Sequence, residues 1–132
     1  MKKVLLIDDD IDDRDMFRAA LKLLDAEIEY IEAVDGHEAL EMLSELGFVA
    51  PDIIFVDLNM PRVTGLEFVI RVKALAKYHK VPTYIYTTSA SPRERVNCIS
   101  AGASGYIVKK MTTKDLAAEL APLLSKIAVA QH

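Results

Sequence analysis

The sequence alternates five short apolar runs with amphipathic stretches, and this alternation restricts the possible folds more than any other feature. The apolar runs span residues 4–7, 28–34, 53–56, 83–86 and 106–108. Three of them are nearly unbroken aliphatic or aromatic segments, which is typical of parallel strands that are covered on both faces. We therefore predict an α/β fold in which a doubly wound, five-stranded parallel sheet carries helices on both faces.

The amphipathic stretches between the runs have helical spacing and recognisable ends. Ser91–Glu94 supplies an N-cap serine, a first-turn proline and a capping-box glutamate, and Thr112 with Asp115 repeats the device. Pro122 lies inside the last apolar stripe, where we expect it to kink or interrupt the helix. Carboxylates crowd the predicted first turn after the first strand, where they suit the helix dipole; they are Asp12, Asp13 and Asp15.

Length and composition exclude several classes of protein. The 132 residues suit one domain, 1–132, with a core over about residues 2–128, and the single cysteine excludes an internal disulfide or a cysteine-based zinc site. No apolar run approaches the roughly 18 residues of a membrane span. The first apolar run is followed directly by carboxylates, which argues against a secretory signal peptide. The net charge of −4 argues against general nucleic-acid binding. We expect a cytoplasmic protein with neither membrane nor nucleic acid as a partner.

Polar and charged residues follow four of the predicted strands. They are Asp8-Asp9-Asp10, Asp57, Thr87-Thr88-Ser89 and Lys109-Lys110. Ligand sites in such sheets lie beyond the carboxyl ends of the strands. If the first and third strands are neighbours, three or more carboxylates converge there, and two such charges about 4 Å apart repel by roughly 4 kcal/mol at an effective dielectric near 20. A cation would relieve this repulsion, and Mg²⁺ is the natural candidate because it takes hard oxygen ligands.

The same residues suit phosphoryl chemistry. The Asp57 carboxylate can attack phosphorus to give an aspartyl phosphate. A metal ion and the Lys109 ammonium would neutralise the transferring group, to which the Thr87 hydroxyl could donate a hydrogen bond. Each residue also has a plain structural interpretation, as a turn carboxylate, a solvated lysine or a sheet-end hydroxyl. Their joint placement at successive strand ends favours the phosphoryl site.

These motifs resemble the receiver domain of bacterial two-component response regulators, in particular the single-domain regulators of the chemotaxis type. The matching segments are Ile7–Asp10, Asp57–Pro61 with Gly65, Tyr86–Ser89 and Gly105–Lys109. The resemblance covers about residues 2–128 and implies a flavodoxin-like fold with strand order 2-1-3-4-5. It also implies a switch that accepts a phosphoryl group on Asp57, in a Mg²⁺-dependent reaction, from a histidine kinase or a histidine phosphotransfer protein. Such a protein is not an enzyme toward other substrates, because it catalyses only its own phosphorylation and dephosphorylation.

The resemblance also assigns metal ligands, position by position. Asp9 and Asp57 are expected to hold Mg²⁺ through their carboxylates. Asn59 is expected to contribute its backbone carbonyl, and Asp8 to act mainly through water. The donor set that the resemblance implies is therefore made entirely of oxygen atoms.

Further residues receive roles in the switch from the same resemblance. Lys109 is expected to contact the phosphoryl group, Thr87 to move toward it, and Tyr106 to swing into the space that Thr87 vacates. Asn59 and Ser89 occupy positions that tune the rate of phosphate loss. The signal is expected to leave through the fourth helix, the fifth strand and the fifth helix, toward an unknown target protein or a second copy in a phosphorylation-linked homodimer. Few residues follow the fifth helix, so we expect no attached output domain.

One position departs from the family pattern. The family's lysine is usually followed by proline, often after a cis peptide bond, whereas Lys110 follows Lys109 here. A cis bond before a residue other than proline costs about 2.5–4 kcal/mol, so we expect a trans bond. This departure bears on the reach of Lys109 into the site.

Three other functions compete with that of a receiver domain. A haloacid-dehalogenase-type phosphatase needs a second aspartate two residues after its nucleophile, where this chain has Asn59. A flavodoxin-like cofactor binder needs a phosphate-cradling loop after the first strand, where Asp8–Asp10 would repel the phosphate. An adaptor that works without phosphorylation stays open, although Asp57, Thr87 and Lys109 argue against it.

Overall fold

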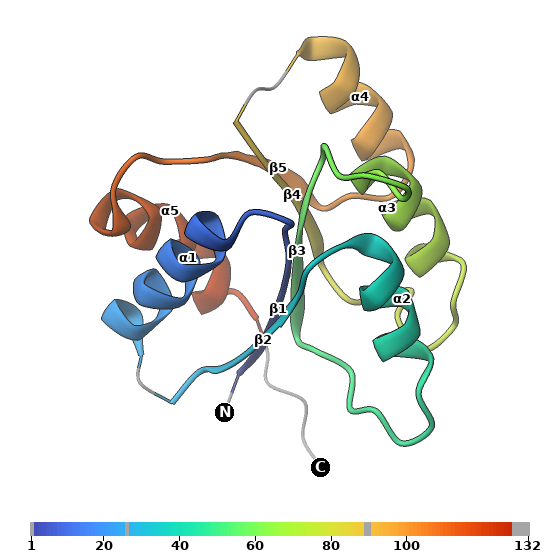
Figure 1. Cartoon of the computed structure of the whole chain (residues 1–132), viewed down its shortest axis with the longest axis horizontal. Helices are drawn as coiled ribbons and strands as arrows, with labels where there is room; N and C mark the ends of the chain where they lie inside the picture. Colours follow the sequence, from blue (N-terminus) through green and yellow to red (C-terminus); the bar gives the residue numbers. More distant parts are fainter. Residues whose placement is uncertain (1, 26, 89–90, 128–132) are drawn as a thin grey trace.

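The structure, a computed structural model, describes residues 2–25, 27–88 and 91–127. In this part of the chain, parallel strands alternate with helices (Figure 1). The strands are β1 (Lys3–Ile7), β2 (Glu29–Ala33), β3 (Ile53–Asp57), β4 (Thr83–Thr87) and β5 (Gly105–Val108). The helices are α1 (Ile11–Leu24), α2 (Gly36–Ser44), α3 (Gly65–Lys73), α4 (Pro92–Ser100) and α5 (Thr113–Ser125).

The five strands form one parallel sheet in the order β2-β1-β3-β4-β5, so the predicted doubly wound, flavodoxin-like fold is confirmed. β1 pairs with β3 from Val4 opposite Ile53 to Ile7 opposite Val56. Because all strands run in the same direction, their carboxyl ends lie at one edge of the sheet, the upper edge in Figure 1. The adjacency of β1 and β3 brings the acidic segments that follow them to this edge.

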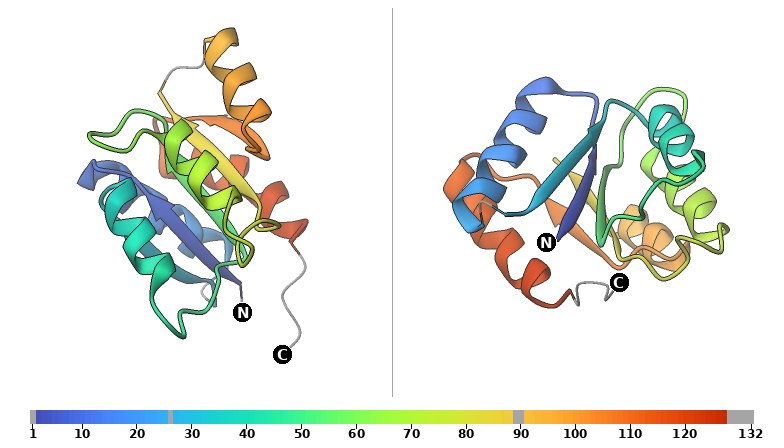
Figure 2. Two further views of the ribbon diagram at one scale, coloured as in Figure 1. Left: turned by 90° about the vertical axis from the view of Figure 1, so that its right-hand side faces the viewer. Right: turned by 90° about the horizontal axis from the view of Figure 1, so that it is seen from below.

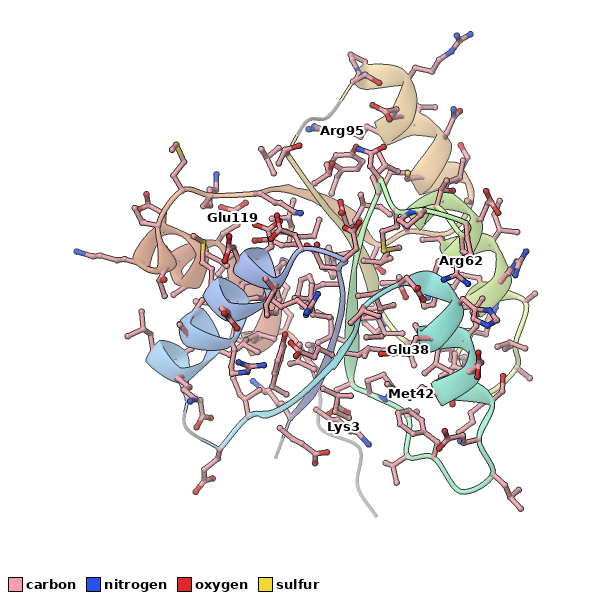
Figure 3. The ribbon with its side chains drawn as sticks, in the orientation of Figure 1. Lys3, Glu38, Met42, Arg62, Arg95 and Glu119 are labelled. Carbon is pink, nitrogen blue, oxygen red and sulfur yellow. The ribbon has the colours of Figure 1, made fainter. Side chains whose placement is uncertain are left out.

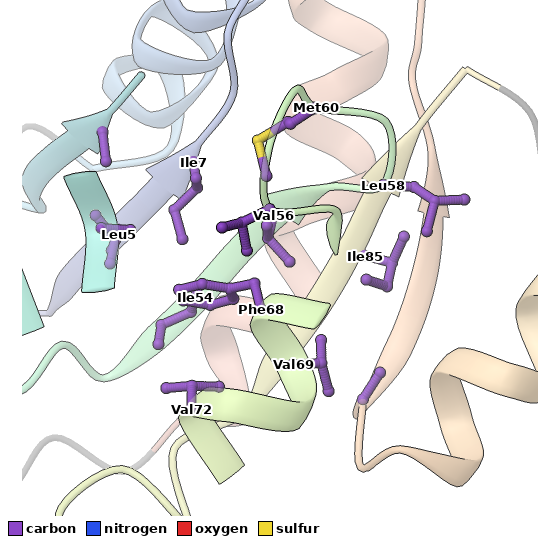
Figure 4. Packing of buried hydrophobic residues seen from close by; sticks show 14 of the residues in the cluster. Leu5, Ile7, Ile54, Val56, Leu58, Met60, Phe68, Val69, Val72 and Ile85 are labelled. Carbon is purple, nitrogen blue, oxygen red and sulfur yellow. The ribbon is translucent and has the colours of Figure 1, made fainter. Parts of the chain in front are cut away.

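Helices cover both faces of the sheet (Figures 1 and 2). Successive side chains of a strand point to opposite faces. Ile54 and Val56 therefore pack under α3 (Figure 4), while Phe55 packs on the other face under α1. Under α1 and α5, the rings of Phe17 and Phe55 lie 5.1 Å apart between centroids. The two apolar layers hold β1 and β3 rigidly, and therefore also the polar residues at their ends.

Local signals place the starts of α4 and α5 where the sequence predicts them. Ser91 Oγ accepts the Glu94 N–H at 3.0 Å, and Thr112 Oγ1 accepts the Asp115 N–H at 3.1 Å. Of the predicted kink or interruption at Pro122, the interruption is wrong, because α5 runs through Pro122 to Ser125. The carbonyl that loses its helical donor belongs to Ala118, an exposed residue, so water can satisfy it.

Within residues 2–25, 27–88 and 91–127, no helix combines the length and the apolar character that a membrane-spanning helix needs.

Candidate functional site

Asp8 follows β1 and is held in place from three directions. Its N–H donates to Ala33 O at 3.1 Å, which continues the β1–β2 pairing by one residue. Its Oδ1 accepts the Asp10 N–H at 2.9 Å, and Arg14 Nη1 on α1 donates to its backbone oxygen at 2.9 Å. Asp8 is fully buried, so β2, its own loop and α1 together fix a carboxylate below the protein surface.

The predicted carboxylate cluster forms at this edge of the sheet. One carboxylate oxygen from each of Asp8, Asp9 and Asp57 lies within 4.8 Å of the other two. Asp9 is exposed and Asp57 is only 7% exposed, so the cluster opens to solvent on one side. Asp10 takes no part, because its side chain caps α1 by accepting the Asp12 N–H at 2.8 Å. Three converging carboxylate oxygens suit a small hard cation such as Mg²⁺.

Asp57 is the last residue of β3, and the loop after it is tightly packed. The Asn59 N–H donates to Asp57 Oδ1 at 3.4 Å, and the Gly65 N–H donates to Leu58 O at 2.9 Å. A Cβ atom on residue 65 would lie 2.5 Å from the backbone oxygen of Asp57. Only glycine therefore lets α3 begin this close to the end of β3, which explains Gly65 in the motif.

Lys109 enters the site from the end of β5. Its N–H donates to Thr87 O at 2.7 Å, which extends the β4–β5 pairing by one residue. Its Nζ lies 2.9 Å from Asp8 Oδ2, 2.7 Å from Asp13 Oδ2 and 3.7 Å from Asp57 Oδ2. None of the described peptide bonds is cis, so the bond to Lys110 is trans, as predicted, and Lys109 still reaches the carboxylates.

Burial and mutual repulsion dominate the electrostatics of the cluster. Burial, with repulsion from Asp8 and Asp9, raises the pKa of Asp57 to about 6, although the Lys109 ammonium and the Asn59 N–H oppose the rise. Burial also raises the pKa of Asp8 above its usual value. Burial by itself would lower the pKa of Lys109, but its hydrogen bonds to carboxylates outweigh burial and raise it. Lys109 is therefore a firmly charged cation among carboxylates that are costly to ionise.

The remaining predicted site residues lie around this cluster. Thr87 Oγ1 is buried and has no hydrogen-bond partner among the residues that the structure describes. Tyr106 is half-buried, and the guanidinium of Arg95, labelled in Figure 3, lies 5.3 Å from the centre of its ring. Asn59 is exposed beside Asp57. Ser89 lies outside the described residues.

Sequence reasoning missed the closest partner of Lys109, which is Asp13. The sequence pattern indicates only that the first-turn acids of α1 suit the helix dipole. Asp13, however, precedes the buried Phe17 by four residues and Ala20 by seven, so helical spacing places it on the face that packs against the sheet. Asp12 does not share this spacing and is exposed. This periodicity was the signal that could have identified Asp13.

Comparisons with known proteins agree with this geometry. The family model described as the response regulator receiver domain matches residues 4–121. A CheY homolog of Campylobacter jejuni is 33% identical over 122 residues, which is 92% of each chain. The structure of chemotaxis protein CheY4 of Vibrio cholerae shares 35% identity, with a TM-score of 0.79 over 97% of this chain and 99% of that one. The sensor histidine kinase CheAY of Helicobacter pylori is 37% identical over 106 residues, and the match spans only 13% of its length.

Proposed function

Because this chain belongs to the response regulator receiver domain family of two-component signalling, we propose that Asp57 is its phosphoryl acceptor. Receiver domains act as signalling switches that work with histidine kinases and downstream targets, and we assign the donor here as a histidine kinase or a histidine phosphotransfer protein. One observation carries the proposal: Asp57 ends a buried strand within a carboxylate cluster, 3.7 Å from the ammonium of Lys109. Asp8 also follows a buried strand and lies 2.9 Å from Lys109, but it is fully buried, whereas Asp57 keeps 7% of its surface exposed.

The transfer is a direct displacement at phosphorus. An oxygen of Asp57 forms a bond to phosphorus while the bond between phosphorus and the donor's imidazole nitrogen breaks. The electron pair of the broken bond stays on that nitrogen, which then takes up a proton from water. With its pKa raised to about 6, Asp57 is mostly ionised at pH 7 and is therefore able to act as the nucleophile.

The residues at the site fit a bound Mg²⁺. We assign Asp9 and Asp57 as carboxylate ligands, Asn59 as a ligand through its backbone carbonyl, and Asp8 as a residue that acts mainly through water. When bound, Mg²⁺ supplies positive charge to the phosphoryl oxygens. The fit is supported by the oxygen-only donor set and by the raised pKa values of Asp8 and Asp57, because carboxylates in such surroundings are stabilised by a cation.

Three residues complete the proposed switch. Lys109 contacts the phosphoryl group through its ammonium, and Thr87 turns its hydroxyl toward a phosphoryl oxygen. The buried Thr87 Oγ1 has no hydrogen-bond partner in the described part of the chain, and a buried hydroxyl without a hydrogen bond costs free energy. A phosphoryl oxygen that accepts a hydrogen bond from it would remove this cost. Tyr106 then moves inward from its contact with Arg95. In this scheme Asn59 and Ser89 tune the loss of the phosphoryl group.

Intact-mass measurement with acetyl phosphate tests the acceptor. With Mg²⁺ present, we expect the mass to rise by about 80 Da, the increment of one phosphoryl group. We expect no increase for Asp57→Asn, since its amide cannot form the mixed anhydride, and a much smaller one with EDTA in place of Mg²⁺. Asp52→Asn is the matched control, because Asp52 precedes β3 and lies away from the cluster, hydrogen-bonded to the Lys3 N–H.

Three outcomes would contradict the proposal. If the mass of the natural protein does not rise with acetyl phosphate and Mg²⁺, Asp57 is not the acceptor, and an adaptor that works without phosphorylation is favoured. An adduct that persists in Asp57→Asn moves the acceptor to another side chain. An adduct of the same yield with and without Mg²⁺ removes the metal from the mechanism.

We assign the output to the surface formed by α4, β5 and α5, which is rich in exposed apolar side chains. They are Val96 and Ile99 on α4, Val108 at the end of β5, and Met111 in the loop before α5. We expect beryllofluoride, which mimics a phosphoryl group on a carboxylate, to change the affinity of this surface for a target protein or a second copy. Sedimentation velocity with and without beryllofluoride measures the second-copy case, and titration calorimetry measures the affinity for a partner once one is in hand. Equal affinities in both states would remove this assignment.

A further inference from the structure

We propose that Asp13 is a positioning residue that holds the Lys109 ammonium on the α1 side of the site, away from Asp57. The inference rests on the proposed function, since it concerns how that function is restrained in the unphosphorylated protein. Asp13 is not one of the three carboxylates whose oxygens converge as candidate metal ligands. It acts through its hold on Lys109.

The distances around Lys109 Nζ are unequal in a consistent way. The ammonium lies 2.7 Å from Asp13 and 2.9 Å from Asp8, which are the lengths of charge-assisted hydrogen bonds. Its distance to Asp57 is 3.7 Å, too long for a hydrogen bond. The side chain of Lys109 is only 9% exposed, so water competes little for its protons. In the unphosphorylated protein the ammonium is therefore held by Asp13 on α1 and by Asp8, and not by the proposed acceptor.

The first turn of α1 is well placed to act as a fixed anchor. Arg14, the next residue, donates to the backbone oxygen of Asp8 at 2.9 Å and lies 3.6 Å from the Glu32 carboxylate on β2. Tyr30 Oη donates to the same carboxylate at 2.7 Å. α1 is thus joined to β1 and β2 beside the site, and Asp13 cannot follow Lys109 if the ammonium moves.

A competition follows from this placement. A phosphoryl group on Asp57 attracts the Lys109 ammonium, which must stretch or leave its bond to Asp13 to reach it. Removing the Asp13 charge frees the ammonium to approach Asp57 beforehand. The ammonium then opposes Mg²⁺ at the same carboxylate but assists an anionic group attached to it. The two ligands should respond in opposite directions, which a merely structural role of Asp13 would not produce.

The test measures Mg²⁺ and beryllofluoride affinities of the full chain by titration calorimetry. For Asp13→Asn we expect the Kd for Mg²⁺ to rise about three- to tenfold and, at saturating Mg²⁺, the Kd for beryllofluoride to fall about threefold. Asp12→Asn is the matched control, since it removes the same charge from an exposed neighbour without touching Lys109. Asp13→Glu, which keeps the charge, should restore values near those of the natural protein.

A double-mutant cycle ties the effect to the lysine. In a Lys109→Met background, Asp13→Asn should change the Kd for Mg²⁺ no more than Asp12→Asn does. Circular dichroism checks the fold of every variant, and Asp13→Ser replaces Asp13→Asn if the latter does not fold. The proposal is overturned if the Asp13 and Asp12 variants behave alike, or if both Kd values move in the same direction. If the proposed role of Asp13 is overturned in this way while the natural protein still gains the mass of a phosphoryl group, the proposed function stands. If the natural protein binds neither Mg²⁺ nor beryllofluoride, both the role of Asp13 and the proposed function are overturned.

Discussion

Replacing Lys109 by methionine is expected to lower the free energy of unfolding by about 3–5 kcal/mol at pH 7 without Mg²⁺, the range seen when one partner of a buried ion pair is removed. The ammonium is shared by Asp8, Asp13 and Asp57, and Asp8 is fully buried. Methionine resembles the aliphatic part of lysine as far as Cε, but it removes the ammonium that lies over the Tyr86 ring and leaves the carboxylates without a cation. Urea unfolding followed by circular dichroism measures the loss.

The neighbouring lysine supplies the control. Lys110 is 36% exposed, and its Nζ lies 4.0 Å from Glu119, so Lys110→Met should cost less than about 1 kcal/mol. We also expect Mg²⁺ to recover part of the stability of Lys109→Met, because a divalent cation bound to the folded state neutralises the same carboxylates. Equal losses for the two variants would show that Lys109 does not offset the charge of the cluster.

Replacing Asp57 by asparagine is expected to have the opposite effect on stability. Burial raises the pKa of this carboxyl from 3.8 to about 6, so keeping it ionised at pH 7 costs the folded protein about 3 kcal/mol. Asparagine has nearly the same shape and carries no charge. Without Mg²⁺ at pH 7, Asp57→Asn should therefore raise the free energy of unfolding by up to about 3 kcal/mol, as measured by urea titration.

The sign of the pH dependence follows from proton binding. Between about pH 4 and pH 6 the folded protein binds more protons at Asp57 than the unfolded chain does, so this group makes stability fall as pH rises through that window. Its contribution is fully present below pH 4 and lost above pH 6. The difference between natural protein and Asp57→Asn should thus be small at pH 4 and reach its maximum near pH 7. A difference that does not change over this range would contradict the raised pKa.

Local patterns in the sequence account for much of the fold. The apolar runs place the strands to within one or two residues, and hydroxyl caps such as Ser91 and Thr112 place the starts of helices, because both depend on residues close together in the chain. Pro122 shows the limit of such patterns. Its effect depends on whether the carbonyl it deprives of a donor meets water, which only the packing of α5 determines.

The candidate site depends more on contacts between distant segments than the strands and helix starts do. Asp8, Asp9 and Asp57 were expected to converge only if the first and third strands were neighbours, and it is the observed order β2-β1-β3-β4-β5 that brings them together. Apolar periodicity cannot specify that order, because the strands of a doubly wound sheet are buried on both faces and therefore have similar apolar sequences. The resemblance to a known family, and not the pattern itself, supplied the order in advance.

The sequence by itself determined the residue types at the strand ends, the α/β class and the chemistry those residues can perform. Only the tertiary structure decided how the charges are shared: that Lys109 bonds to Asp13 across 96 residues of chain, and that burial raises the pKa of Asp57. The physical reason is that spacing along the chain reports which face of an element a side chain occupies, whereas ion pairing and desolvation depend on distances between elements that the packing of the whole sheet sets.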